Sequence, residues 1–152
     1  MKRFRFPLNP VKVVRAQAKQ RAQEQFAQSV HAYVESEETL ASTRARVARL
    51  EQEMRAGRGE GIRAADAAFV FAAYRREAAA EVESEQKMIA ARAEMEKRRG
   101  EYLEAHRRLE VVNRLETKAR TVYRLEASRE EQVEFDELAG RRHSARQTRF
   151  AL

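Results

Sequence analysis

The sequence predicts an all-α protein: an antiparallel two-helix coiled-coil hairpin whose second helix is longer than its first. Three observations support this fold class. Charged residues make up 36% of the 152 residues, Gly and Pro contribute only 5 and 2, and apolar residues recur at intervals of seven. Large apolar residues are few, with 7 Phe, 4 Tyr and no Trp. Two long helices that share a thin apolar seam therefore fit the composition better than a thick globular core.

The composition excludes several other classes. A β-sandwich or barrel needs many turns rich in Gly and Pro, which this chain lacks. The longest uncharged apolar run, from Ala67 to Tyr74, has eight residues, whereas a membrane-spanning helix needs about 20. We therefore expect a single domain over residues 1–152 that does not insert into a membrane. The absence of Cys excludes disulfide frameworks and thiolate zinc sites.

The first predicted elements are an N-terminal arm over residues 1–9 and a helix over residues 10–56. Asn9 is a favourable N-cap, and Pro10 is tolerated at the first helical position because its missing N–H has no acceptor there. A stripe at intervals of seven is typical of a coiled-coil seam, and it consists of Phe26, Tyr33, Leu40, Val47 and Met54. The row three positions later is mostly small and polar: Ser29, Ser36, Thr43 and Leu50.

A turn is predicted at residues 57–61, followed by a second helix over 62–140 and a basic tail over 141–152. Three glycines within the turn admit positive φ, and each costs a helix about 1 kcal/mol relative to Ala. A phosphate-binding loop is not indicated, because neither of the glycine motifs that bind nucleotides is present.

Folding about Gly59 sets the expected pairing of the two helices. Residue i would lie opposite about position 118 − i, so that Leu50 lies near Ala68. The start of the first helix then lies opposite about residue 108 of the second helix, which leaves about 30 residues of the second helix without a partner in the same chain.

Charge is distributed unevenly along the chain. The first 21 and the last 12 residues together carry 11 basic residues and no acidic one, and all 24 acidic residues lie between Glu24 and Glu137. Basic ends favour an acidic partner surface. On charge alone, nucleic acid, anionic lipid and an acidic protein ring all qualify.

Two apolar segments have no evident partner within a two-helix hairpin. The run from Ala67 to Tyr74 is apolar all round the helix, so it carries a small cap over the hairpin end, docks another protein, or does both. The end of the second helix either frays or folds against a partner. Its apolar residues are Leu115, Val122, Tyr123, Leu125, Val133, Phe135 and Leu138.

No enzyme is predicted. His31, His106 and His143 have no metal-binding spacing. The carboxylates alternate with arginines along the helices, as in ordinary solvated pairs, and a two-helix hairpin offers no pocket for catalysis. We therefore expect no catalytic residue, no metal site and no cofactor.

Motifs at the two ends resemble one family. The string Phe4-x-Phe6-x-Leu8-x-x-Val11-x-x-x-Arg15 resembles the opening of FliJ, the coiled-coil component of the bacterial flagellar type III export apparatus. The segment from Glu130 to Arg141 is similar to that family's terminal signature of acidic and apolar residues followed by Ala and Arg. Length and the helix–turn–helix layout agree with this resemblance.

The resemblance implies a stalk-like hairpin that inserts into the hexameric ring of the export ATPase, contacts the membrane export gate and handles export chaperones. It implies a cytoplasmic protein held peripherally at the inner face of the cell membrane, at the flagellar base. Gate contacts are expected at Phe71, Tyr74, Ala78 and Val82, with Phe69 included because Ala78 is smaller than the family's residue and the register is open by one. Ring contacts are expected at Phe4, Phe6, Leu8, Arg15, Phe135, Leu138, Arg141 and Arg142.

Two alternatives remain open from the sequence. A basic coiled coil can bind nucleic acid non-specifically through its ends, although no nucleic-acid-binding motif is present and no such partner is expected. The chain can also be a structural spacer without a partner.

Overall fold

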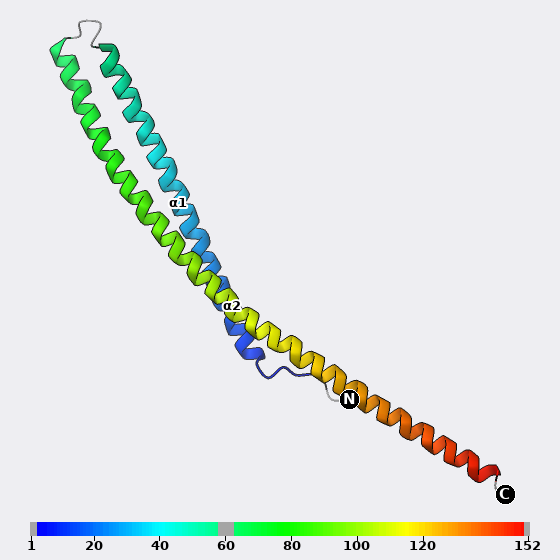
Figure 1. Ribbon diagram of the computed structural model, residues 1–152. Helices are drawn as coiled ribbons and strands as arrows, with labels where there is room; N and C mark the ends of the chain where they lie inside the picture. Colours follow the sequence, from blue (N-terminus) through cyan, green and yellow to red (C-terminus); the bar gives the residue numbers. More distant parts are fainter. Residues whose placement is uncertain (1–2, 58–62, 151–152) are drawn as a thin grey trace. The chain divides into compact units, whose positions relative to one another are not determined.

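The chain forms two long helices, α1 (Asn9–Gly57) and α2 (Ala64–Phe150), in a computed structural model that describes residues 3–57 and 63–150 (Figure 1). The helices run antiparallel and pack against each other, and the described residues contain no strand. The predicted all-α hairpin with a longer second helix is confirmed. The chain divides into two compact units. We call residues 18–105 the hairpin unit, and residues 1–17 with 106–152 the arm unit.

Helix α1 begins one residue earlier than expected. The amide of Lys12 donates to the carbonyl of Leu8 at 2.9 Å, so Leu8 rather than Asn9 occupies the capping position. Pro10 is then the second helical residue, where a missing N–H is still harmless because the first four amides of a helix have no acceptor within it.

The boundaries of α2 also differ from those expected. The helix begins at Ala64, and the amides of Asp66 and Ala67 donate to the carbonyl of Arg63 at 3.0 and 3.1 Å. The predicted turn lies outside the described residues except for Gly57, which ends α1. The helix continues through the expected basic tail to Phe150, because a single helical glycine at 140 costs only about 1 kcal/mol and no Pro follows it.

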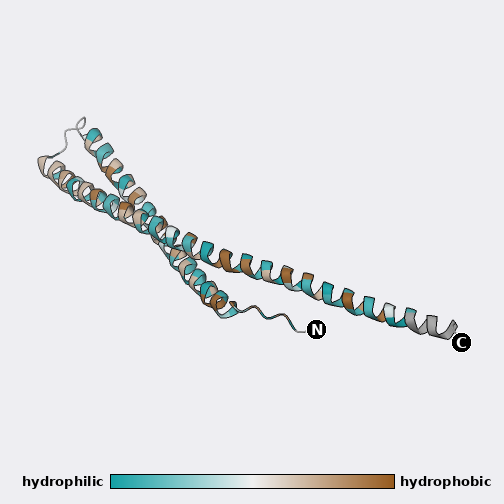
Figure 2. Ribbon diagram, turned by 60° about the horizontal axis from the view of Figure 1, so that its bottom comes forward, coloured by the Kyte–Doolittle hydropathy of each residue, from teal (hydrophilic) through white to brown (hydrophobic). Residues whose placement is uncertain are grey.

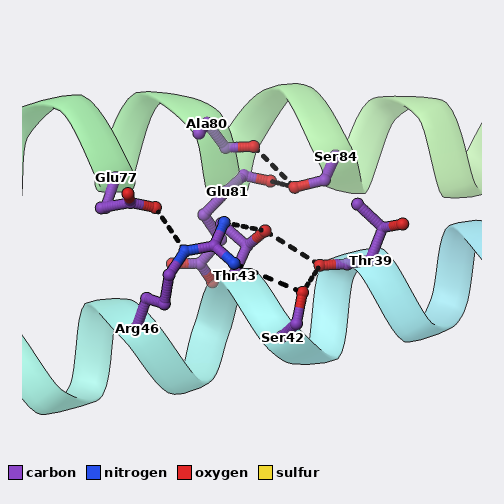
Figure 3. A network of polar contacts seen from close by, with 8 residues as sticks. All are labelled: Thr39, Ser42, Thr43, Arg46, Glu77, Ala80, Glu81 and Ser84. Atoms are coloured by element: carbon purple, nitrogen blue, oxygen red, sulfur yellow. Dashed lines mark hydrogen bonds and ion pairs between the residues drawn. The ribbon is translucent and has the colours of Figure 1, made fainter.

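The seam of the hairpin unit is thin and mixed in character. Leu40 and Val47 from the predicted stripe are buried, with Leu40 only 4% exposed, and the other stripe residues are half-buried. Thr43, from the small polar row, is the least exposed at 2%. Its hydroxyl donates to the carbonyl of Thr39, and that of Ser84 to the carbonyl of Ala80 (Figure 3). These buried hydroxyls are therefore satisfied within their own helices.

The pairing of the helices differs from the expectation. Phe26 stacks on Tyr102, with ring centroids 6.1 Å apart, and Arg98 donates to Gln25 at 3.2 Å. These partners lie five to ten positions further along α2 than folding about Gly59 requires, so the expected pairing of Leu50 with Ala68 is wrong. Helix α1 ends at Gly57 and α2 begins at Ala64, so the midpoint between the two helices lies beyond Gly59. A shift close to one heptad still keeps the stripe of α1 in the seam.

Ion pairs outside the seam fix this register. Arg44 binds two glutamates of α2, with Nε 3.1 Å from Glu81 and Nη2 3.0 Å from Glu85. Arg46 donates to Glu77 at 3.0 Å (Figure 3). A single exposed ion pair is worth little, but three bonds from two arginines within one turn of α1 to glutamates on successive turns of α2 favour one alignment over its neighbours.

Candidate protein-docking surfaces

The described residues offer no site for metal chemistry. None of them forms a group of three or more His, Cys, Asp or Glu side chains able to hold an ion. Within residues 3–57 and 63–150, neither helix contains a stretch long and apolar enough to cross a membrane. Three exposed surfaces among the described residues are considered as candidate sites.

The first surface is a groove in the hairpin unit where α1 ends and α2 begins. It has a volume of about 500 Å³ and is mainly apolar. Its described lining residues are Glu53, Met54 and Gly57 from α1, with Ala67, Ala68, Val70 and Phe71 from α2. The all-round apolar run of α2 produces this groove, because one side of the run faces α1 and the rest stays open.

The five expected gate residues occupy different surroundings. Phe71 lines the groove, whereas Phe69, 71% exposed, and Val82, 57% exposed, do not. Tyr74 and Ala78 are half-buried. We call the groove together with Phe69 the tip patch. The sequence did not point to Met54 as part of this patch, because its place in the heptad stripe indicated only a seam residue.

The second surface is the arm, residues 3–8, which packs against α2 within the arm unit. The rings of Phe4 and Tyr123 are tilted, with centroids 5.4 Å apart. The guanidinium of Arg120 lies 5.4 Å from the centre of the Phe4 ring, a cation–π geometry. The sequence suggested that Tyr123 has no partner within the hairpin, but its ring contacts the arm. A recess of about 700 Å³ beside the arm is lined by Phe4, Arg5, Phe6, Pro7, Asn9, Pro10, Glu116 and Arg120.

Glu116 ties the start of α1 to α2 beneath the arm. Its carboxylate accepts from Lys12 at 2.6 Å and from Arg120 at 3.1 Å, and its side chain is 19% exposed. Hydrogen bonding by the Lys12 ammonium is the main cause that lowers the pKa of Glu116, and burial partly opposes it. The sequence did not single out Glu116 or Arg120, because each has the spacing of an ordinary solvated charge on a helix.

The third surface is the end of α2. Phe135 is 70% exposed and Leu138 is 53% exposed. Arg141 pairs with Glu137 at 3.6 Å, and Arg141 and Arg142 are both exposed. We call Phe135, Leu138 and the two arginines the α2-end patch.

The expected ring residues are thus not one cluster. Phe4 and Phe6 are half-buried in the arm, Leu8 is 39% exposed and Arg15 is half-buried on α1. Phe4 contacts α2 at Tyr123, and Phe135 lies 12 residues further on, about 18 Å along the helix.

The two units differ in net charge. The arm unit contains 16 basic and 8 acidic residues, whereas the hairpin unit contains 15 basic and 16 acidic residues. The net charge of +7 therefore resides in the arm unit, which also carries the α2-end patch.

Together these features define a coiled-coil hairpin protein with exposed apolar docking surfaces and a basic arm unit. The chain belongs to the FliJ family: the family model described as "Flagellar FliJ protein" matches residues 4–148, nearly the whole chain. Comparison with curated proteins and with solved structures gives no match. The resemblance seen in the end motifs is confirmed, and membership makes the chain a component of the flagellar export apparatus, in a family that is non-catalytic.

Replacing Phe4 by Ala is expected to release the arm. The substitution removes one aromatic contact and one cation–π contact, each worth about 0.5–1.5 kcal/mol. Limited trypsin digestion should show faster cleavage after Arg5, at least about fivefold, because roughly 1 kcal/mol is a factor of five. Val14→Ala, at an exposed position of α1, is the control and should not change the rate. Equal cleavage rates would mean that the Phe4 contacts do not hold the arm.

Acidification is expected to loosen the link between Lys12 and α2. The folded-state pKa of Glu116 is lowered, so the stabilisation is present above the ordinary carboxyl value of 4.5 and is lost as pH falls below it. Hydrogen exchange of amides near Lys12, corrected for the intrinsic pH dependence, should lose protection in this window. Glu116→Gln should show the weaker protection at neutral pH and no such transition. A transition that persists in Glu116→Gln would assign the effect to another group.

Proposed function

We propose that this protein is a stalk-like hairpin that engages the hexameric export ATPase with its arm unit and the membrane export gate with its tip patch. Through these contacts it assists the handling of export chaperones and their substrates and changes the activity of the ATPase, without catalysis or a cofactor of its own. It works in the cytoplasm, held peripherally at the inner face of the cell membrane at the flagellar base.

The segregation of charge between the two units carries this proposal. An excess of eight basic residues in the arm unit favours an acidic partner, and a ring lined by acidic loops supplies one. The α2-end patch sets two exposed apolar side chains beside arginines. That combination fits an interface with an apolar centre and a charged rim.

The tip patch supports a separate contact with the gate. The hairpin unit is nearly neutral, and its groove is apolar, so this contact relies on apolar burial rather than on charge. Phe69 and Phe71 offer two exposed aromatic rings, the residue type that often dominates interfaces. The two surfaces share no residue, so each contact can be removed by substitution without changing the residues of the other.

The gate contact is tested by Phe69→Ser combined with Phe71→Ser. We expect binding to the purified cytoplasmic part of the export gate to weaken by at least about tenfold, since removing an interface aromatic commonly costs more than 1 kcal/mol. Motility should fall with it, while ATPase binding stays unchanged. Val34→Ser, exposed on α1 of the same unit, is the matched control.

Unchanged gate binding would remove the tip patch from the proposal. Tight binding to a nucleic-acid duplex of any sequence at physiological salt, weakening steeply as salt rises, would instead favour the non-specific nucleic-acid alternative, because phosphate contacts of this kind depend on counterion release.

A further inference from the structure

A second apolar stripe runs along α2 within the arm unit, and neither α1 nor the arm covers it. It consists of Val111, Leu115, Val122, Leu125 and Val133, each between 43% and 58% exposed. Steps of 4, 7, 3 and 8 residues keep these side chains on one face, because an α-helix has 3.6 residues per turn. Figure 2 shows apolar residues recurring along this part of α2.

The stripe lies on a different face from the contacts already described. Val112, which is 5% exposed, and Tyr123, which meets the arm, each follow a stripe residue by one position, about 100° around the helix. Phe135 and Leu138 follow Val133 by two and five residues and so project from other sides. The arm contact, the α2-end patch and the stripe can therefore be tested separately.

Charge along the same segment changes sign near the middle of the stripe. Residues 106–125 contain six basic and two acidic side chains, whereas residues 126–138 contain six acidic side chains and one basic. Val122, midway between Val111 and Val133, lies close to this change. A partner helix that matches this segment must therefore be acidic at one end, basic at the other and apolar between them.

The same segment of a second copy, running in the opposite direction, has this distribution of charged and apolar residues. We propose that a second copy of the chain covers the stripe, and that the two α2 helices associate antiparallel over residues 107–137 with the two Val122 side chains at the twofold axis. Val111 then faces the partner's Val133, and the basic half of each segment faces the acidic half of the other. A parallel pair would instead set like charges against each other.

A charge-reversal experiment on the full chain tests the pairing. One variant changes Arg107, Arg108, Arg114 and Lys118 to Glu, and the other changes Glu126, Glu130, Asp136 and Glu137 to Lys. Sedimentation equilibrium should show a monomer–dimer equilibrium for the wild type, and a dimer dissociation constant at least about tenfold higher for each variant alone. Mixing the two variants should restore association, because each now complements the other.

A wild-type chain that stays monomeric at about 100 μM would overturn the proposal. So would a mixture that associates no better than either variant alone. Circular dichroism of each variant checks that α2 remains helical, and Val122→Asp, which leaves both charged halves intact, should also weaken the dimer if the stripe is buried.

Single cysteines decide the orientation, since the chain contains none of its own. Val122→Cys should form a disulfide with its own copy. Leu115→Cys should not do so alone but should crosslink when mixed with Arg129→Cys, because these two positions are equidistant from Val122. Arg124→Cys, on another side of the helix, is the control.

Self-crosslinking of Leu115→Cys as efficient as that of Val122→Cys would indicate a parallel pair and contradict the proposal. None of these readouts involves the export ATPase or the gate, so their outcome is independent of the proposed function.

Discussion

Replacing Phe135 and Leu138 by alanine is expected to weaken binding to the export ATPase ring by more than about 30-fold. Truncating a buried aromatic anchor commonly costs about 2 kcal/mol or more, and each 1.4 kcal/mol is a factor of ten in the dissociation constant. Both side chains are more than half exposed in the free chain, so the substitutions leave the hairpin itself intact. Binding to the purified ATPase, measured by calorimetry, checks the prediction.

Two comparisons sharpen this experiment. Replacing the four C-terminal arginines, Arg141, Arg142, Arg146 and Arg149, by Gln should mainly flatten the salt dependence of binding, because charges at the rim of an interface act on association rate more than on affinity. The pair Phe69→Ser and Phe71→Ser should leave ring binding unchanged. If that pair weakened ring binding as much as the Phe135 and Leu138 substitutions, the assignment of one partner to each unit would be wrong.

Leu40→Ala is expected to produce the largest loss of stability in the hairpin unit, about 2–3 kcal/mol. Leu40 is one of three buried apolar residues among those described, with Val47 and Val112. Leu→Ala in a packed interior costs about 2–5 kcal/mol, and a thin seam that can partly close over the gap favours the lower part of that range. Urea unfolding followed by far-ultraviolet circular dichroism should show a lower midpoint.

The control for this prediction is Val34→Ala, because Val34 is an exposed apolar residue of the same helix. Its expected effect is within about 0.5 kcal/mol. If Leu40→Ala lowered the midpoint no more than Val34→Ala, burial in the seam would not be what holds the two helices together.

Periodicity made the fold predictable, but not the alignment of its helices. The stripe from Phe26 to Met54 identifies α1 and its buried face, and the lack of Pro after Pro10 allows helices of this length. A heptad pattern looks the same after a slip of seven residues, so the pairing of Phe26 with Tyr102 depends on which side chains meet across the seam and on Arg44 and Arg46 outside it.

The candidate surfaces were predicted unevenly for a related reason. Phe69, Phe71, Phe135 and Leu138 stood out because an apolar residue without a seam position needs another explanation, and all four are half exposed or more. The docked arm was missed. The arm and the start of α1 contact residues of α2 more than a hundred positions away, through one aromatic pair and the Glu116 carboxylate, and no local sequence pattern indicates contacts of this kind.

The hydroxyls of Ser29, Thr43 and Ser84 have a mechanical consequence. Each donates to a carbonyl of its own helix, so drawing α1 and α2 apart breaks none of these bonds. These three hydroxyls therefore add no directional bond between the two helices. Directional contacts between the helices come instead from the glutamates that bind Arg44 and Arg46, from the hydrogen bond of Arg98 to Gln25, and from the stacked rings of Phe26 and Tyr102. When the two helices are pulled apart or twisted, we therefore expect the ion pairs outside the seam to break, whereas the hydroxyl hydrogen bonds inside it stay intact.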